Sequence, residues 1–295
     1  MQKIVPHLWF DTEARQAAEL YTSLLPNSKI HHVTTLKDTP SGDADIVSFT
    51  LAGYSFMAIS AGPHFTMNPS ISFMVNFDPA QDPEAATRID RVWNALAEGG
   101  KILMPLGAYP FSERYGWVQD RWGVSWQLIL TKPEGEPRPV IIPSLLYVTN
   151  TGIAAKEATD FYLSVFKNST RGALMPNDSG GVMFTDFMLE KQWFAATDGS
   201  SSMHQFAFNE GVSLMVQCET QEEIDYYWSA LSAHPENEQC GWLKDKFGVS
   251  WQITPVAMGE MMANGTPEQV ARVTQAFLPM KKFDIATLQA AFEGK

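Results

Sequence analysis

The sequence predicts an α+β protein that consists of two tandem copies of one domain. The strongest observation is a repeated motif. Residues 116–127 read Gly-Trp-Val-Gln-Asp-Arg-Trp-Gly-Val-Ser-Trp-Gln, and residues 241–252 match them at eight of twelve positions. A second block, 21–27, is similar to 162–168. Self-similarity of this kind indicates a duplicated structural unit, and a chain of 295 residues suits two domains of ordinary size.

The spacing of the shared blocks locates a difference between the copies. The blocks at 21–27 and 65–75 return 141 residues later, whereas the motif returns only 125 residues later. The second copy therefore lacks 16 residues ahead of its motif. The first copy keeps them in the segment 99–111, which carries Tyr109 and Phe111.

Composition sets the expected domain boundaries. Residues 131–139 hold three prolines and one glycine beside charged side chains, which is typical of a linker. Near the C-terminus, Thr266, Pro267 and Gln269 form a helix start signal, and Asp284 can cap a further helix. We expect domain 1 over 1–131, a linker over 132–140, domain 2 over 141–256 and a helical tail over 257–295.

Hydrophobic periodicity predicts one order of elements in both copies. In the first copy, strands are expected near 5–10, 29–36, 45–51, 54–60, 71–77, 102–106, 115–119 and 125–130. Ala14, Ala17 and Tyr21 recur at helical spacing, and Asp82 begins a second helix that runs to about Glu98. Each copy is thus strand, helix and three strands, repeated once. Four such modules would form two curved mixed sheets with helices on their outer faces.

Composition and charge exclude several classes of partner. Hydrophobic residues make up 45% and charged residues 18% of the chain, an ordinary globular balance. The net charge of −12 opposes binding to a phosphate backbone, so we expect no nucleic-acid partner. No apolar run reaches bilayer length, and residues 1–10 do not look like a signal peptide. With only Cys218 and Cys240, we expect reduced thiols and a cytoplasmic protein without a membrane partner.

These motifs resemble the PhnB-like branch of the glyoxalase, or vicinal-oxygen-chelate, proteins. The resemblance rests on Pro-His-Leu-Trp-Phe-Asp at 6–11 and on Asp-x-x-Gly-Val-Ser-Trp-Gln at 120–127 and 245–252, and it covers nearly the whole chain. It implies an α+β fold of two tandem glyoxalase-like domains, each built from two βαβββ modules whose curved mixed sheets form a cleft. Members of this branch are sometimes labelled ubiquinone-pathway methyltransferases, yet this sequence has no Rossmann-type glycine-rich cofactor turn.

The resemblance also implies where a metal would bind. In metal-dependent relatives, four cleft-facing side chains, typically His, Gln or Glu, hold one divalent ion that acts as a Lewis acid. The corresponding positions are Ile4 or Pro6, Ala58, Ser72 and Gln127 in the first copy, and Pro143, Ala195 or Ala196, Ser213 and Gln252 in the second. One amide oxygen per site cannot hold a catalytic ion. We therefore expect no metal and no other cofactor. Any metal that did bind would use Gln127 and Gln252.

Candidate ligand-binding residues come from both copies. They are Ser72, Tyr109, Phe111, Trp126 and Gln127 in the first copy, and Ser213, Trp251 and Gln252 in the second. The tryptophans could stack on a ligand or pack in the core, and the glutamines could bind a ligand or bond across the cleft. Asp120 and Asp245 are expected to shape a turn in which Gly123 and Gly248 adopt a positive φ. His7 is expected beneath the first helix.

We expect the protein to bind a small, mostly apolar molecule in its cleft, with catalysis left open. One alternative is a divalent-metal-dependent lyase, isomerase or dioxygenase of the same superfamily. Another is a non-catalytic interaction module whose clefts are filled by side chains.

The two copies are expected to pack as an internal pseudo-dimer, in a chain that is a monomer or a homodimer. The longer segment 99–111 favours the first copy as the ligand-binding one. The alternative is that this segment forms a strand and hairpin that pack against the other copy.

Overall fold

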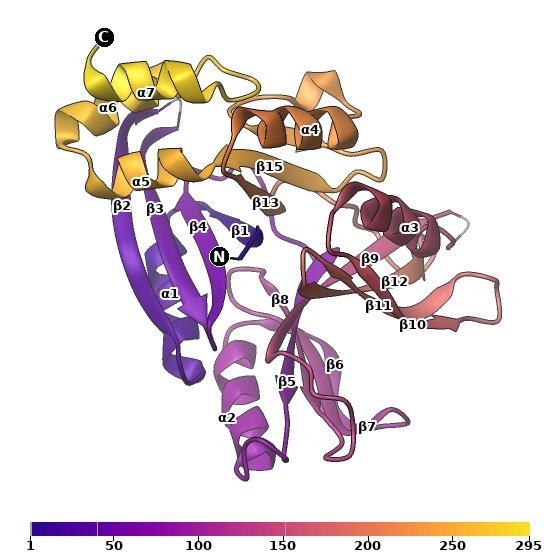
Figure 1. Ribbon diagram of the computed structural model, residues 1–295. Helices are drawn as coiled ribbons and strands as arrows, with labels where there is room; N and C mark the ends of the chain where they lie inside the picture. The colour runs from indigo at the N-terminus through magenta and orange to yellow at the C-terminus, as the bar shows by residue number, and fades with distance from the viewer. Residues whose placement is uncertain (1, 40, 151) are drawn as a thin grey trace.

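A computed structural model describes residues 2–39, 41–150 and 152–295, and its elements follow the predicted modules (Figure 1). The first copy contains β1 (Ile4–Phe10), α1 (Ala14–Leu24), β2 (Lys29–Thr39), β3 (Gly42–Leu51), β4 (Tyr54–Ser60), β5 (Ile71–Phe77), α2 (Ala85–Ala97), β6 (Lys101–Tyr109), β7 (Ser112–Gln119) and β8 (Ser125–Leu130). The second copy contains β9 (Ile141–Thr149), α3 (Ala155–Val165), β10 (Thr170–Pro176), β11 (Val182–Leu189), β12 (Gln192–Ser200), β13 (Val212–Cys218), α4 (Gln221–Leu231), η1 (Pro235–Asn237), β14 (Trp242–Lys244) and β15 (Ser250–Pro255). The tail adds α5 (Val256–Asn264), α6 (Pro267–Phe277) and α7 (Ile285–Glu293).

The strands form two mixed sheets, and each sheet takes one module from each copy. Sheet A has the order β14-β15-β13-β1-β4-β3-β2, and sheet B has the order β10-β11-β12-β9-β5-β8-β7-β6. The copies join where β1 runs antiparallel to β13 and β5 runs antiparallel to β9. The predicted fold class and the internal pseudo-dimer are confirmed, and the dimer contact consists of continuous backbone ladders.

The four helices of the modules cover one face of each sheet. The helices α1 and α4 pack on sheet A, and α2 and α3 pack on sheet B. Side chains alternate along a strand, so in β1 the fully buried Ile4 and Leu8 join the core beneath the helices. Val5, His7 and Trp9 lie on the opposite side, which we call the helix-free face. Candidate ligand-binding positions are those on the helix-free faces.

Two asparagines tie the copies together where the chain crosses between the sheets. Asn68 Nδ2 donates to the carbonyl of Ala207 at 2.9 Å, and Asn209 Nδ2 donates to the carbonyl of Thr66 at 2.8 Å. The two bonds are reciprocal, and the asparagines are 141 residues apart like the blocks that contain them. This part of the shared sequence therefore holds the pseudo-twofold contact between the copies.

The tail spans the two ends of sheet A. Helix α5 contacts β15 at one end of the sheet and β2 at the other, and α6 also contacts β2 (Figure 1). Backbone bonds from Cys240 N to Met280 O and from Gly241 N to Lys281 O, both 2.7 Å, fix the segment after α6 beside the start of β14. A Cβ at Gly241 would lie 2.4 Å from the ring of Phe283, so this close approach requires glycine. None of the helices in the described ranges is long and apolar enough to cross a membrane.

The segment 99–111 forms most of a hairpin at the edge of sheet B. Strand β6 pairs with β7, and its main other contact is with α2 of the same copy. The alternative interpretation predicted a strand and hairpin that pack against the other copy. The strand and hairpin are present, but they pack within their own copy. In the second copy the short η1 and the three-residue β14 take its place.

Candidate functional site

The Asp-x-x-Gly motif forms the turn that the sequence predicted. The Oδ1 atom of Asp120 accepts the backbone N–H groups of Trp122 and Val124 at 2.9 and 3.1 Å, and Gly123 has a φ of 92°. Its Oδ2 atom accepts the Tyr21 hydroxyl at 2.5 Å and the Trp126 indole N–H at 3.0 Å. A single buried carboxylate therefore links the first helix to the last strand of the copy.

The second copy repeats this arrangement. Asp245 accepts the hydroxyl of Tyr162 at 2.7 Å and the indole N–H of Trp251 at 2.8 Å, together with two backbone N–H groups. Burial raises the pKa of Asp120 and Asp245 above the usual range, while these hydrogen bonds oppose that shift. Trp126 and Trp251, 2% and 0% exposed, lie in the core beneath the helices. Each indole donates to the aspartate of its motif and packs in this core, on the other side of the sheet from the helix-free face.

Four other candidates come together on the helix-free face of sheet B. Gln127 Nε2 donates to Ser72 Oγ at 2.7 Å, and the hydroxyl of Tyr115 donates to Gln127 Oε1 at 2.7 Å. Tyr109 and Phe111 pack edge-to-face on Tyr115, with ring centroids 5.5 and 5.0 Å away. Both ends of the Gln127 amide are already bonded within the protein, and Phe111 stays 54% exposed at the hairpin.

Ser213 and Gln252 form the equivalent pair on sheet A, where Gln252 Nε2 donates to Ser213 Oγ at 2.9 Å. Directly opposite Ser213, across the β1–β13 ladder, stands His7. The expectation that His7 lies beneath the helix was wrong, because Ile4 and Leu8 occupy the helix side and alternation turns His7 the other way.

His7 is the functional candidate that the sequence reasoning missed. Its ring is buried, contacts Trp242 edge-to-face at 5.5 Å, and its Nδ1 atom has no hydrogen-bond partner. Burial lowers the pKa of His7 to about 4, so the imidazole is neutral at pH 7. On sheet B, Ser144 holds the corresponding place opposite Ser72. The large apolar side chains at alternate positions of β1 were the signal that could have placed His7 correctly.

The side chains that face one another do not fit a catalytic divalent metal. The expected positions Ile4 and Ala58 are fully buried in the helix-side core. The expected sets were also drawn within one copy, whereas each helix-free face combines strands of both. On sheet A the facing set is His7, Met57, Ser213 and Gln252. Across residues 2–39, 41–150 and 152–295, no three His, Cys, Asp or Glu side chains gather as metal ligands.

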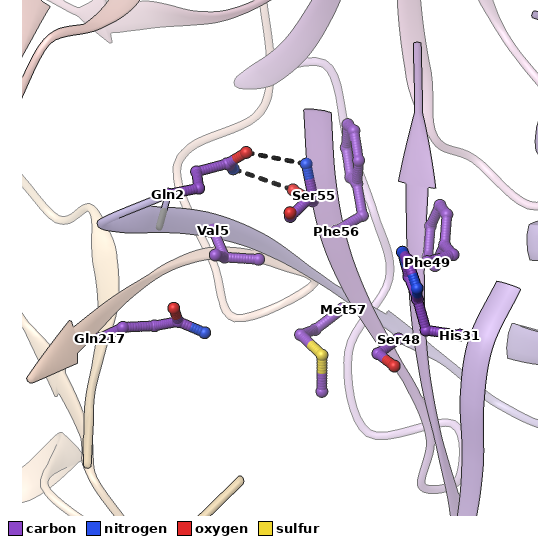
Figure 2. Close-up of a pocket in the computed structure, with 9 residues that line it drawn as sticks. All are labelled: Gln2, Val5, His31, Ser48, Phe49, Ser55, Phe56, Met57 and Gln217. Carbon is purple, nitrogen blue, oxygen red and sulfur yellow. Dashed lines mark hydrogen bonds between the residues drawn. The ribbon is translucent and has the colours of Figure 1, made fainter. Parts of the chain in front are cut away.

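A hollow of about 160 Å³ opens on the helix-free face of sheet A, beside this set. Its walls include Val5 and Met57, and Met57 is the register partner of His7. Figure 2 shows Gln217 and Met57 approaching the same space from opposite sides, with Val5 between them. The amide of Gln2 is fixed by two hydrogen bonds to the backbone of Ser55, at 2.8 and 3.0 Å. The complete lining is Gln2, Val5, His31, Ser48, Phe49, Ser55, Phe56, Met57 and Gln217.

Comparison with known structures shows that the chain has a glyoxalase-like fold. Glyoxalase I from Zea mays superposes with a TM-score of 0.51 over 85% of this chain and 92% of its own, at 11% identity. The sequence model of the 3-demethylubiquinone-9 3-methyltransferase family matches residues 2–129 and again 139–254. The chain belongs to this family, whose PhnB-like character the motifs had indicated.

Single-copy relatives match about half of the chain. A PhnB protein from Bacillus cereus is 38% identical over 44% of this chain and 100% of its own, with a TM-score of 0.40. A protein from Pseudomonas aeruginosa is 27% identical over 44% of this chain and 98% of its own, with a TM-score of 0.37. No functionally curated protein matches the chain significantly.

Proposed function

We propose that the chain binds a small, mostly apolar and uncharged molecule on the helix-free face of sheet A. The hollow beside Met57 carries this proposal, because it combines apolar walls with a few polar groups, as small-molecule sites do. The hollow is open to solvent, and its volume of about 160 Å³ is similar to that of an enclosed cavity that holds one benzene-sized molecule. The polar groups are the carboxamides of Gln2 and Gln217, the hydroxyls of Ser48 and Ser55, and the imidazole of His31. Burial, Lys29 and His32 lower the pKa of His31, and the other four groups are neutral, so the hollow favours a neutral ligand.

The residues beside Met57 include a side chain that can act as an acid or a base. A ligand that reaches past Met57 would approach His7, Ser213 and Gln252, which lie in register beside it. The neutral imidazole of His7 has an unpartnered nitrogen, which can donate or accept one hydrogen bond according to its tautomer. Binding alone is the function that the geometry supports best, and catalysis would need this imidazole.

The same proposal needs neither a metal nor a methyl donor. One imidazole and one carboxamide are too few ligands for a catalytic divalent ion, so we expect purified protein to carry well under one equivalent of zinc, nickel, iron or manganese. Elemental analysis measures this. Stoichiometric metal that is lost on Gln127→Ala or Gln252→Ala would contradict it. The methyl transfer in the family name would also need a cofactor site, and the sequence has no glycine-rich turn for one.

Filling the hollow should weaken ligand binding at least tenfold. Ser55→Trp places at this position the side chain that Trp193 supplies at the corresponding place in sheet B, and the hydrogen bonds from Gln2 reach only the backbone of residue 55. Thermal-shift screening of the unaltered protein with small aldehydes, oxyanions and aromatic compounds first identifies a ligand. We expect the Kd of this ligand, measured by calorimetry, to be at least tenfold higher for Ser55→Trp and for the milder change Met57→Phe.

Matched changes on sheet B decide between the two faces. Tyr109→Ala and Phe111→Ala alter the aromatic cluster beside Gln127 and leave the hollow untouched. The proposal predicts an unchanged Kd for both. If only these two changes weaken binding, the ligand lies on sheet B with Ser72 and Gln127, and the assignment to sheet A is wrong.

A further inference from the structure

The helix-free face of sheet B carries a charged site at the place that corresponds to the hollow. The stacked pairs Phe49–Phe56 in sheet A and Phe187–Phe194 in sheet B occupy matching registers. Asp186 therefore corresponds to Ser48, and Trp193 corresponds to Ser55. Two small neutral side chains on one sheet are replaced by a carboxylate and an indole on the other.

The linker fills this site with one side chain. Arg138 Nη2 lies 3.1 Å from Asp186 Oδ2, and the guanidinium carbon lies 4.0 Å from the centroid of the Trp193 ring. The Asp186 side chain is only 8% exposed. Residues 132–137 before Arg138 are all exposed, whereas Asn76 Nδ2 holds the carbonyl of Pro139 just after it. Arg138 is thus the inward anchor of an otherwise solvent-facing strap.

A hydrogen bond that does not involve Arg138 also holds the Asp186 carboxylate. Asp186 Oδ1 accepts the backbone N–H of Ala173 at 2.6 Å, which leaves Oδ2 for the guanidinium. A Cβ at residue 172 would lie 2.1 Å from Oδ1, so Gly172 is required for this approach. A buried carboxylate beside an aromatic face recognises planar cations through a charge-assisted hydrogen bond and a cation–π contact.

We propose that Asp186 and Trp193 form a guanidinium-binding site that the chain closes with its own Arg138, and that opens to a free guanidinium ligand when the linker moves away. This site on sheet B is separate from the neutral hollow on sheet A. The face of sheet B would then bind a cation, and the face of sheet A a neutral molecule. A tethered side chain competes with a free ligand at an effective concentration in the millimolar range. Removing Arg138 should therefore expose the site.

The test is calorimetric titration of full-length Arg138→Ala with methylguanidinium, far below denaturing concentrations. We expect a Kd at least tenfold lower than in the unaltered protein, no binding of urea, which has a similar planar shape without charge, and loss of binding in Arg138→Ala/Asp186→Asn. Binding that is equal in Arg138→Ala and the unaltered protein, or that survives Asp186→Asn, overturns the proposal.

A second measurement uses the unaltered chain and does not depend on any variant folding. The protease Glu-C can cut after Glu134 in the exposed strap. Methylguanidinium should displace Arg138 and speed this cut several-fold, while urea at the same concentration should not. Cleavage at equal rates with both compounds contradicts the opening of the site.

Discussion

Replacing Asp245 with alanine is expected to lower the free energy of unfolding by about 3–5 kcal/mol, the range for breaking a buried, multiply bonded charge site. The carboxylate accepts hydrogen bonds from Tyr162, Trp251 and two backbone N–H groups. Alanine leaves the Trp251 indole and the two backbone N–H groups without an acceptor in a site that is 0% exposed. The Tyr162 hydroxyl keeps only the longer contact of 3.3 Å with the Tyr147 hydroxyl. Urea unfolding followed by circular dichroism measures the change.

Two comparisons make this result specific. Asp120→Ala removes the same set of bonds from the first copy and should cost a similar amount. Asp178→Ala changes an exposed aspartate in the β10–β11 turn, and such surface changes usually stay within about 0.5 kcal/mol. A loss below about 1 kcal/mol for both buried positions would show that the motif does not anchor the strands.

Acidification is expected to destabilise the protein through His7 by about 3 kcal/mol between pH 6.5 and pH 4. Burial lowers the pKa of His7 in the folded state to about 4 from 6.5. The unfolded chain therefore binds the proton first, so this stability is fully present above pH 6.5 and is lost as the pH falls to about 4. Below that pH both states are protonated and the contribution stays constant.

The second copy supplies the matched control. His7→Ser installs the residue that Ser144 provides at the corresponding place on sheet B. Other groups titrate equally in both proteins, so the difference between their unfolding free energies at pH 7 and pH 4.5 isolates His7. If the two proteins lose the same stability over that range, the imidazole is not buried in its neutral form.

The repeat made the fold predictable, but the partners of each strand were hidden. Eight identities in the motif, the linker prolines and the alternation within strands identified the modules and their order. A repeat does not say that β1 pairs with β13 of the other copy as well as with β4 of its own. Ligand sets drawn within one copy therefore mixed residues of different faces. Asp120 and Gly123 were placed correctly because their turn is local, within five residues.

Part of the site could not be predicted because it depends on contacts between distant residues. A shift of one residue along a strand moves every side chain to the other face of the sheet. The prediction for β1 was shifted by one residue, so it placed Ile4 in the cleft and His7 beneath the helix. Nothing near Arg138 in the sequence points to Asp186, which lies 48 residues later. The hollow likewise joins Gln2, Met57 and Gln217 across both copies.

Because each sheet contains strands of both copies, the order of synthesis determines when each strand of the nascent chain can pair. Strand β5 meets β9 soon after the first copy is made, but β1 must wait for β13 at residues 212–218. At about 5–20 residues per second, the free edge of β1 stays without its partner for roughly 10–40 s. The nascent first copy therefore presents an apolar edge strand, and this interval is when a chaperone or a second nascent chain would find it.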